Sequence, residues 1–110
     1  MIKIRFYLNR DEYIDSFTVK GHSRFDEHGR DIVCAAVSVL AQSVVIGLEE
    51  HMGLTLQVKQ QPGDLSCKLT DPLNHARQSE AEAILRTCYL GMLAIQESYP
   101  DYVDIQVIRS

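Results

Sequence analysis

Apolar and polar residues alternate at several places along the chain, and this period of two predicts β-strands. The alternating stretches are 2–9, 13–20, 54–59, 65–69 and 103–107. Asn9-Arg10-Asp11 lies between the first two stretches, and Pro62-Gly63 lies between the next two. Both segments are rich in turn-forming residues, so each pair of strands is predicted to form a hairpin.

Two further stretches carry the spacing of helices. Asp31 is a predicted N-cap, and an apolar pattern follows it to about His51, with Gly53 as the stop signal. Residues 75–98 repeat their apolar positions at intervals of three and four. The first half of the first helix is apolar almost all round, which predicts burial of this helix under a sheet and the second helix, or a face covered by a partner subunit.

These elements predict an α+β fold in the order β-β-α-β-β-α-β, with two helices packed on a mostly antiparallel sheet. A length of 110 residues is suited to one domain, 1–110, since two separate cores would each be too small.

Composition narrows the class of protein. The chain is 45% hydrophobic and 24% charged, as is usual for a soluble globular protein. We expect no membrane association, because no apolar run approaches the roughly 18 residues of a span. Residues 1–6 alternate like a strand and lack the pattern of a signal peptide, so we expect the protein to be located in the cytoplasm. The net charge of −4, without a run of Lys and Arg, argues against direct nucleic-acid binding.

The three cysteines differ in their expected settings. Cys67 alternates with inward-facing strand residues, and Cys88 lies on the apolar stripe of the second helix, so both are predicted to be buried hydrophobes. Cys34 falls at N3 of the first helix, where free backbone amides and the helix dipole stabilise a thiolate, the nucleophilic form. Alternatively, Cys34 simply begins the buried face of that helix.

His22 is the candidate base for Cys34. It follows a predicted strand end beside Gly21, and a Cys–His pair within hydrogen-bond reach is the minimum set for thiol-based acyl transfer. The alternative is an ordinary exposed loop histidine. A metal site built from Cys34, His22, His28 and Asp26 is disfavoured, because this spacing matches no familiar ligand pattern.

Two segments resemble the signature of the ribosomal-processing cysteine proteases, the Prp family. They are Gly-His-Ser at 21–23 and Gly-Arg-Asp-Ile-Val-Cys-Ala-Ala-Val-Ser at 29–38, and the similarity extends over the whole chain in length and element order. The resemblance implies a catalytic dyad of Cys34 and His22, without cofactor or metal. It also implies a homodimer that removes an N-terminal extension, rich in leucine and phenylalanine, from a large-subunit ribosomal protein in bacteria. Cleavage would follow an alanine.

The segment between the two motifs is interpreted as a substrate loop that orders when peptide binds. Gly21, Ser23, Phe25 and Gly29 are its candidate residues, and Phe25 would meet an apolar substrate side chain. Ser23 departs from the family, which usually has Ala at this position. Its hydroxyl is expected to bond to the loop backbone.

Supporting roles are assigned to two further residues and to the helix start. Asp31 is a candidate to orient His22, although its N-cap role explains it fully. Ser38 lies one turn after Cys34 on the same face, within reach of the dyad or of the helix carbonyl at 34. Amides near Cys34 are expected to stabilise the oxyanion of the tetrahedral intermediate.

Two other functional classes remain open at this stage. A non-catalytic ribosome-associated binding module would tolerate loss of Cys34, and a redox or thiol-transfer protein would not need His22.

Overall fold

The computed structural model describes residues 1–27 and 30–110. The elements along the chain are β1 (Ile2–Leu8), β2 (Ile14–Lys20), α1 (Ile32–Ile46), the π-helical segment η1 (Gly47–His51), β3 (Leu56–Gln61), β4 (Asp64–Leu69), α2 (His75–Ser98) and β5 (Val103–Arg109). This order confirms the predicted α+β fold, with both helices placed as the sequence indicated.

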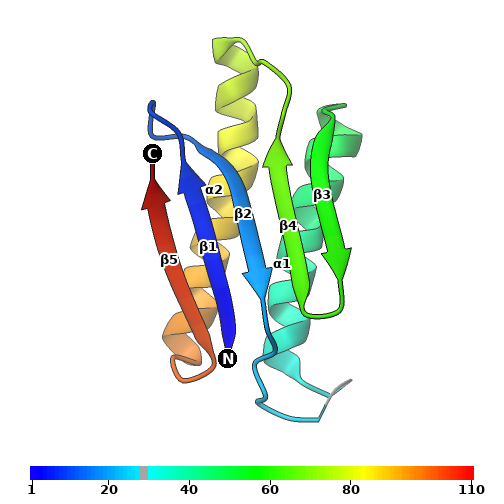
Figure 1. The fold of residues 1–110 in the computed structure, drawn as a ribbon, viewed down its shortest axis with the longest axis vertical. Coiled ribbons are helices and arrows are strands. Elements are labelled where there is room, and N and C mark those ends of the chain that lie inside the picture. The colour runs from blue at the N-terminus through cyan, green and yellow to red at the C-terminus, as the bar shows by residue number, and fades with distance from the viewer. Residues whose placement is uncertain (28–29) are drawn as a thin grey trace.

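One five-stranded sheet carries the two helices on a single face (Figure 1). The strand order is β3-β4-β2-β1-β5. The hairpins β1–β2 and β3–β4 are antiparallel, as is the β2–β4 pair, whereas β1 and β5 run parallel. The helices α1 and α2 run in opposite directions behind the sheet (Figure 1). The parallel pair is possible because α2 provides the long crossover from β4 to β5.

The core lies between the sheet and the helices. Alternate residues of β1 and β2 face it, and Ile4, Phe6 and Phe17 are fully buried. The Phe6 ring stacks on Phe17 across the strands, with centroids 5.8 Å apart, and meets Tyr89 of α2 edge to face at 5.1 Å. Such aromatic pairs add to the stabilisation from area burial. The period of two in the sequence therefore marks the side of the sheet that the helices cover.

The helical stretch Ile32–His51 corrects one sequence expectation. It spans 20 residues and contains an 18-residue window with a mean hydropathy of 2.0, so by length and hydropathy it is sufficient to cross a membrane, although we expected no such run. In this structure it packs against α2, and 28% of that window is buried. The central helix of a globular protein meets the same two criteria, so they do not by themselves place the helix in a membrane.

The outward face of α1 retains an apolar stripe. Ile32, Val39 and Ile46 are 55%, 63% and 59% exposed. They recur every seven residues and thus lie along one side of the helix. The buried side of α1 is formed instead by Val33, Val37, Ala41 and Val44. Of the two explanations offered for this apolar helix, burial within one subunit therefore accounts for the face that carries Val33, Val37, Ala41 and Val44 and leaves the exposed stripe unexplained.

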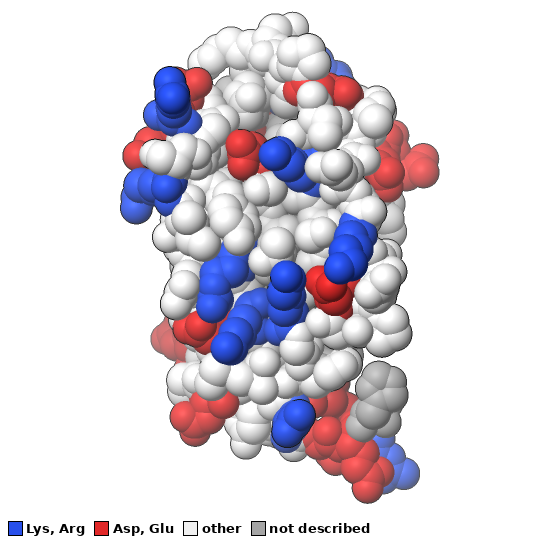
Figure 2. Space-filling model, in the orientation of Figure 1, with Lys and Arg blue, Asp and Glu red and all other residues white. Residues whose placement is uncertain are grey.

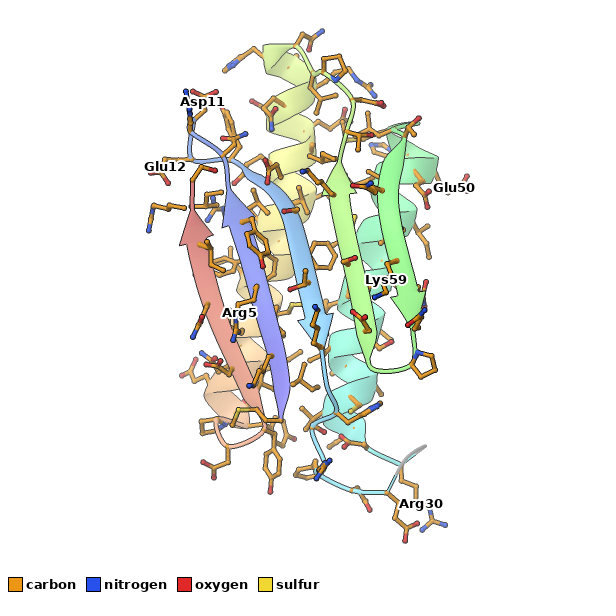
Figure 3. The ribbon with its side chains drawn as sticks, viewed as in Figure 1. Arg5, Asp11, Glu12, Arg30, Glu50 and Lys59 are labelled. Atoms are coloured by element: carbon orange, nitrogen blue, oxygen red, sulfur yellow. The ribbon has the colours of Figure 1, made fainter. Side chains whose placement is uncertain are left out.

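The face of the sheet away from the helices is polar and carries gathered positive charge (Figure 2). The strand register places five cationic side chains on this face: Lys3, Arg5, Lys20, Lys59 and Lys68. Two of them are paired with carboxylates, Arg5 with Asp104 at 3.3 Å and Lys59 with Asp64 at 2.9 Å. Arg5 and Lys59 are labelled on this side in Figure 3. The fold thus brings together cations that are scattered along the sequence.

Three segments meet at one end of the molecule. They are the exit of β2, the start of α1 and the neighbouring β3–β4 turn, whereas the β1–β2 turn with Asp11 and Glu12 lies at the opposite end (Figures 1 and 3). The backbone N–H of Gly21 donates to the carbonyl of Gly63 at 2.8 Å, which fixes the β2 exit to the β3–β4 turn.

Candidate active site

A groove of about 430 Å³ lies between the first turns of α1 and the β3–β4 turn. Its walls include both residues of the predicted dyad, Cys34 and His22. Its apolar lining comes from Ile2, Val19, Val37, Ala41 and Leu65, and its polar lining includes Ser38, Gln42, Gln60, Gln61 and Asp64. A cleft with an apolar floor and a polar rim is suited to an extended peptide, whose backbone must be hydrogen-bonded while its side chains are buried.

Cys34 lies at N3 of α1, and Asp31 is the N-cap, as predicted. The Asp31 Oδ1 atom accepts hydrogen bonds from the N–H groups of Val33 and Cys34, each at 3.0 Å. The N–H of Ala35 donates to the Asp31 carbonyl, also at 3.0 Å. These amides are therefore engaged in the helix start. The cap and the first helical bond already use these three N–H groups, and stabilisation of an oxyanion by amides near Cys34 stays a prediction.

Ser23 supplies the contacts to the Cys34 sulfur. Its backbone N–H donates to Cys34 Sγ at 3.2 Å, and its Oγ lies 3.4 Å from the same sulfur. The hydroxyl also donates to Asp31 Oδ2 and accepts from the N–H of Phe25 at 3.3 Å. The predicted bond from the Ser23 hydroxyl to the loop backbone is thus confirmed.

Asp31 holds the loop as well as the helix. While Oδ1 caps α1, Oδ2 accepts from Ser23 and from the N–H of Phe25 at 3.0 Å. Burial of the carboxyl acts to raise the pKa of Asp31, but the hydrogen bonds from Ser23 and the backbone amides outweigh it and lower the pKa to about 2. The carboxylate is therefore ionised at neutral pH and anchors both sides of the β2–α1 connection. These partners support the N-cap role, and orientation of His22 by Asp31 stays a prediction.

His22 lies against the β3–β4 turn. The Cα of Gly63 is so close that an added Cβ would stand 2.7 Å from His22 Nε2. Gly21, just before the histidine, has a φ of +92°, and a Cβ there would stand 2.6 Å from the carbonyl oxygen of Met1. A glycine is required at 21 for both reasons. The residue that precedes His22 in the groove is therefore at a position that tolerates no side chain.

The remaining predicted residues divide between the groove and its surroundings. Ser38 lines the groove, and its Oγ accepts a hydrogen bond from Gln42 Nε2 at 2.6 Å. Phe25 instead packs edge to face on Tyr99 and Tyr102, with centroids 5.3 and 5.2 Å apart, outside the groove lining. In this structure Phe25 therefore fixes the loop to the end of α2 and the start of β5. Gly29, also a predicted loop residue, lies outside the described residues.

The other two cysteines are buried, as predicted. Cys67 and Cys88 are 2% and 3% exposed. Burial raises the pKa of the Cys67 thiol to about 11 and that of Cys88 to about 12. Both are thus neutral and inaccessible, whereas Cys34 is half-buried at the groove. Within 1–27 and 30–110, no three His, Cys, Asp or Glu side chains gather as metal ligands would.

Sequence reasoning missed the contribution of the β3–β4 turn to this site. Pro62 and Gly63 were interpreted only as the signal for a hairpin, yet both line the groove opposite Cys34. Nothing in the local sequence indicates this, because the turn is more than 25 positions away from Cys34 and joins it only through the sheet order. A glycine paired with proline in a turn is explained by backbone geometry alone.

The family described as cysteine protease Prp matches residues 1–104. The chain belongs to this family. It is therefore a cysteine protease, and the resemblance seen in the two motifs is confirmed. The ribosomal processing cysteine protease Prp of Bacillus subtilis (strain 168) is 28% identical over 104 residues, which cover 92% of this chain and 92% of the relative.

Solved structures share the fold. The essential ribosomal processing protease Prp from S. aureus, in complex with a covalently linked product peptide, superposes with a TM-score of 0.87 at 23% identity and covers 97% of this chain and 99% of its own. The same S. aureus protease with a substrate peptide gives 0.82 at 21% identity, with the same coverage. A Streptococcus mutans protein gives 0.79 at 25% identity and covers 100% of this chain and 96% of its own.

Proposed function

We propose that this cysteine protease removes the N-terminal extension of a bacterial large-subunit ribosomal protein, with Cys34 as nucleophile and His22 as base. The observation that carries the proposal is the groove itself, which places Cys34 and His22 in one peptide-sized cleft. The name of the B. subtilis relative supports ribosomal processing, and the S. aureus complexes show that a protease of this fold holds peptides.

The reaction follows from the chemistry of the two side chains. The His22 imidazole accepts the Cys34 thiol proton, and the thiolate attacks the carbonyl carbon of the peptide bond. The imidazolium then gives the proton to the departing amine as the C–N bond breaks, which leaves a thioester on Cys34. Water, deprotonated by His22, hydrolyses the thioester and regenerates the thiol. The N–H of Ser23 donates a hydrogen bond to Cys34 Sγ at 3.2 Å and so helps to position the sulfur.

The groove lining favours small and apolar residues before the cut. Val37, Ala41 and Leu65 contribute apolar surface beyond Cys34, and Gln60 and Gln61 offer amide groups to a peptide backbone. A leucine- and phenylalanine-rich extension with alanine at the cleavage point, the substrate implied by family resemblance, suits this distribution.

The decisive experiment uses a peptide containing leucine-phenylalanine-phenylalanine-alanine and a basic tail, followed by mass spectrometry. Wild type should cut once after the alanine. Cys34→Ala should abolish cleavage, and His22→Ala should reduce it by about 10³-fold, since general-base assistance to a thiol is of that order. His75→Ala serves as the control, because His75 is an exposed histidine at the start of α2. Binding of the peptide without cleavage by wild type would instead support the non-catalytic module.

The proposal includes a homodimer in the cytoplasm. The apolar stripe of Ile32, Val39 and Ile46 fits a second copy of this chain, whose own stripe is self-complementary to it across a two-fold axis. Light scattering should give twice the chain mass for wild type and the chain mass for Val39→Asp. The matched control is Ile108→Asp, on the opposite face of the sheet at 38% exposure, which should stay dimeric.

A further inference from the structure

The β3–β4 turn forms one wall of the groove, and His22 rests on it. The Gly21 N–H to Gly63 carbonyl bond of 2.8 Å joins the base of the loop to this turn. A Cβ built on Gly63 would stand 2.7 Å from His22 Nε2, 3.3 Å from Cε1 and 3.4 Å from Cδ2. The imidazole therefore occupies the space that any side chain at 63 would need.

A side chain at 63 cannot share that space with the ring. Carbon and nitrogen atoms that are not bonded keep roughly 3.5 Å apart, so a methyl group 2.7 Å from Nε2 requires movement. The turn itself is constrained, because Gln61 and Asp64 pair across the β3–β4 ladder and Gly63 is bonded to Gly21. The imidazole is the more easily displaced partner, since it rotates about two side-chain torsions.

We propose that Gly63 is a positioning residue for catalysis: the bare backbone of the β3–β4 turn is the surface that holds the His22 imidazole in place in the groove that Cys34 also lines. This inference rests on the proposed role of His22 as the base. A shift of the ring by about 1 Å is enough to lower the rate by about 10²-fold, because proton transfer requires hydrogen-bond geometry. The glycine at 63 thus has a function besides completing a turn.

Backbone strain is the competing reason for a glycine here, and the chain contains a matched control. Gly63 has a φ of +71° and Gly53 a φ of +67°, so a side chain is strained to a similar extent at both positions. At Gly53, however, an added Cβ meets nothing within 4 Å. The two glycines therefore differ in the contact with His22 and share the conformational cost.

The first experiment compares Gly63→Ala with Gly53→Ala. Both should lower the Tm by about 5 °C, the usual result of a side chain at positive φ. Gly53→Ala should keep kcat/KM for the peptide within twofold of wild type, whereas Gly63→Ala should lose about 10²-fold, chiefly in kcat. Gly63→Asn and Gly53→Asn repeat the comparison with a residue that tolerates positive φ, so the test does not depend on the alanine variants folding well.

A second measurement tests whether the effect passes through His22. Gly63→Ala in a His22→Ala background should be no slower than His22→Ala alone, because the displaced ring is already absent. The NMR signal of the His22 Cε1–H should shift in Gly63→Ala and stay in place in Gly53→Ala. Wild-type cleavage by Gly63→Ala, an additive loss in the double variant, or an unmoved His22 signal would each overturn the inference.

These outcomes separate the inference from the proposed function. If His22→Ala cleaves normally, the dyad is wrong. If His22→Ala is inactive while Gly63→Ala cleaves like wild type, the dyad stands and only the positioning role of Gly63 is wrong.

Discussion

The two helices begin in the same way, and yet only α1 begins at the groove of the candidate active site. In α1 the Asp31 side chain accepts from the N–H of Cys34 at 3.0 Å, and in α2 the Asn74 side chain accepts from the N–H of Arg77 at 2.9 Å. Cys34 and Arg77 thus occupy the same position, N3. A capping residue and the helix dipole are therefore insufficient to define a site, since α2 has both.

The difference lies in what folds back onto each cap. The second carboxylate oxygen of Asp31 accepts from Ser23 and Phe25, and Ser23 in turn contacts the Cys34 sulfur. Asn74 is exposed and bonds only to its own helix among the described contacts. The α1 start is thus a junction of loop, helix and turn, whereas the α2 start is an ordinary helix end. The cysteines of the two helices reflect this difference. Cys34 lies at the start of α1, whereas Cys88 of α2 is buried against α1.

The largest expected effect separates the cysteines by reactivity. In the folded protein at pH 8, iodoacetamide should modify Cys34 at least about a hundredfold faster than Cys67 or Cys88, since their raised pKa values of about 11 and about 12 leave almost no thiolate. Mass spectrometry should find one adduct in native protein and three in urea. An adduct on Cys88 before one on Cys34 would contradict this contrast between the helices.

Removing each N-cap side chain in turn tests the difference between the two helix starts. Asp31→Ala should lower the free energy of unfolding by about 3 kcal/mol, because it removes the cap and leaves the Ser23 and Phe25 donors without their charged acceptor. Asn74→Ala should cost about 1 kcal/mol, the usual value for a cap alone. Urea denaturation provides the measurement. Peptide cleavage should fall about tenfold or more in Asp31→Ala and stay unchanged in Asn74→Ala. Equal losses of stability and of cleavage in the two variants would refute the distinction between the two helix starts.

The caps should also respond differently to pH. The folded-state pKa of Asp31, about 2, lies below its ordinary value of 3.8. The stability that its charge contributes is therefore complete above about pH 4 and is lost as the pH falls through about 2. The Tm difference between wild type and Asp31→Asn should stay constant from pH 7 to 5 and shrink between pH 4 and 2. The difference for Asn74→Ala should show no such change, because Asn74 does not titrate. A constant difference for Asp31→Asn down to pH 2 would show that the carboxylate charge is not responsible.

The smallest effect concerns the Ser23 hydroxyl. Ser23→Ala should lower the free energy of unfolding by about 1 kcal/mol, since the buried bond to Asp31 is lost. Cleavage should change by less than about threefold, because the backbone N–H that contacts Cys34 Sγ is retained. Ser66→Ala on the open sheet face is the control and should be near neutral in both assays. A loss of cleavage as large as that of Asp31→Ala would assign the hydroxyl a greater role.

The sequence by itself determined the elements and singled out a candidate nucleophile. Alternation at residues 2–9 and 13–20 and the three-four spacing of 75–98 located strands and helix, because one face of each must be buried. Asp31 was identified as the cap and Cys34 as N3, since both are local relations within one turn. The family motifs at 21–23 and 29–38 indicated a dyad of His22 and Cys34, because the two motifs lie close together in the chain.

Only the tertiary structure decided what faces the predicted dyad of Cys34 and His22. The strand order places β4 beside β2, and this pairing brings Gly63 to His22 across a separation of 41 residues. The tertiary structure likewise turned Phe25 toward Tyr99 and Tyr102 and collected five cations on one side of the sheet. These contacts depend on which strands pair and in what register. Local propensity and periodicity specify the elements themselves, and long-range packing selects their neighbours.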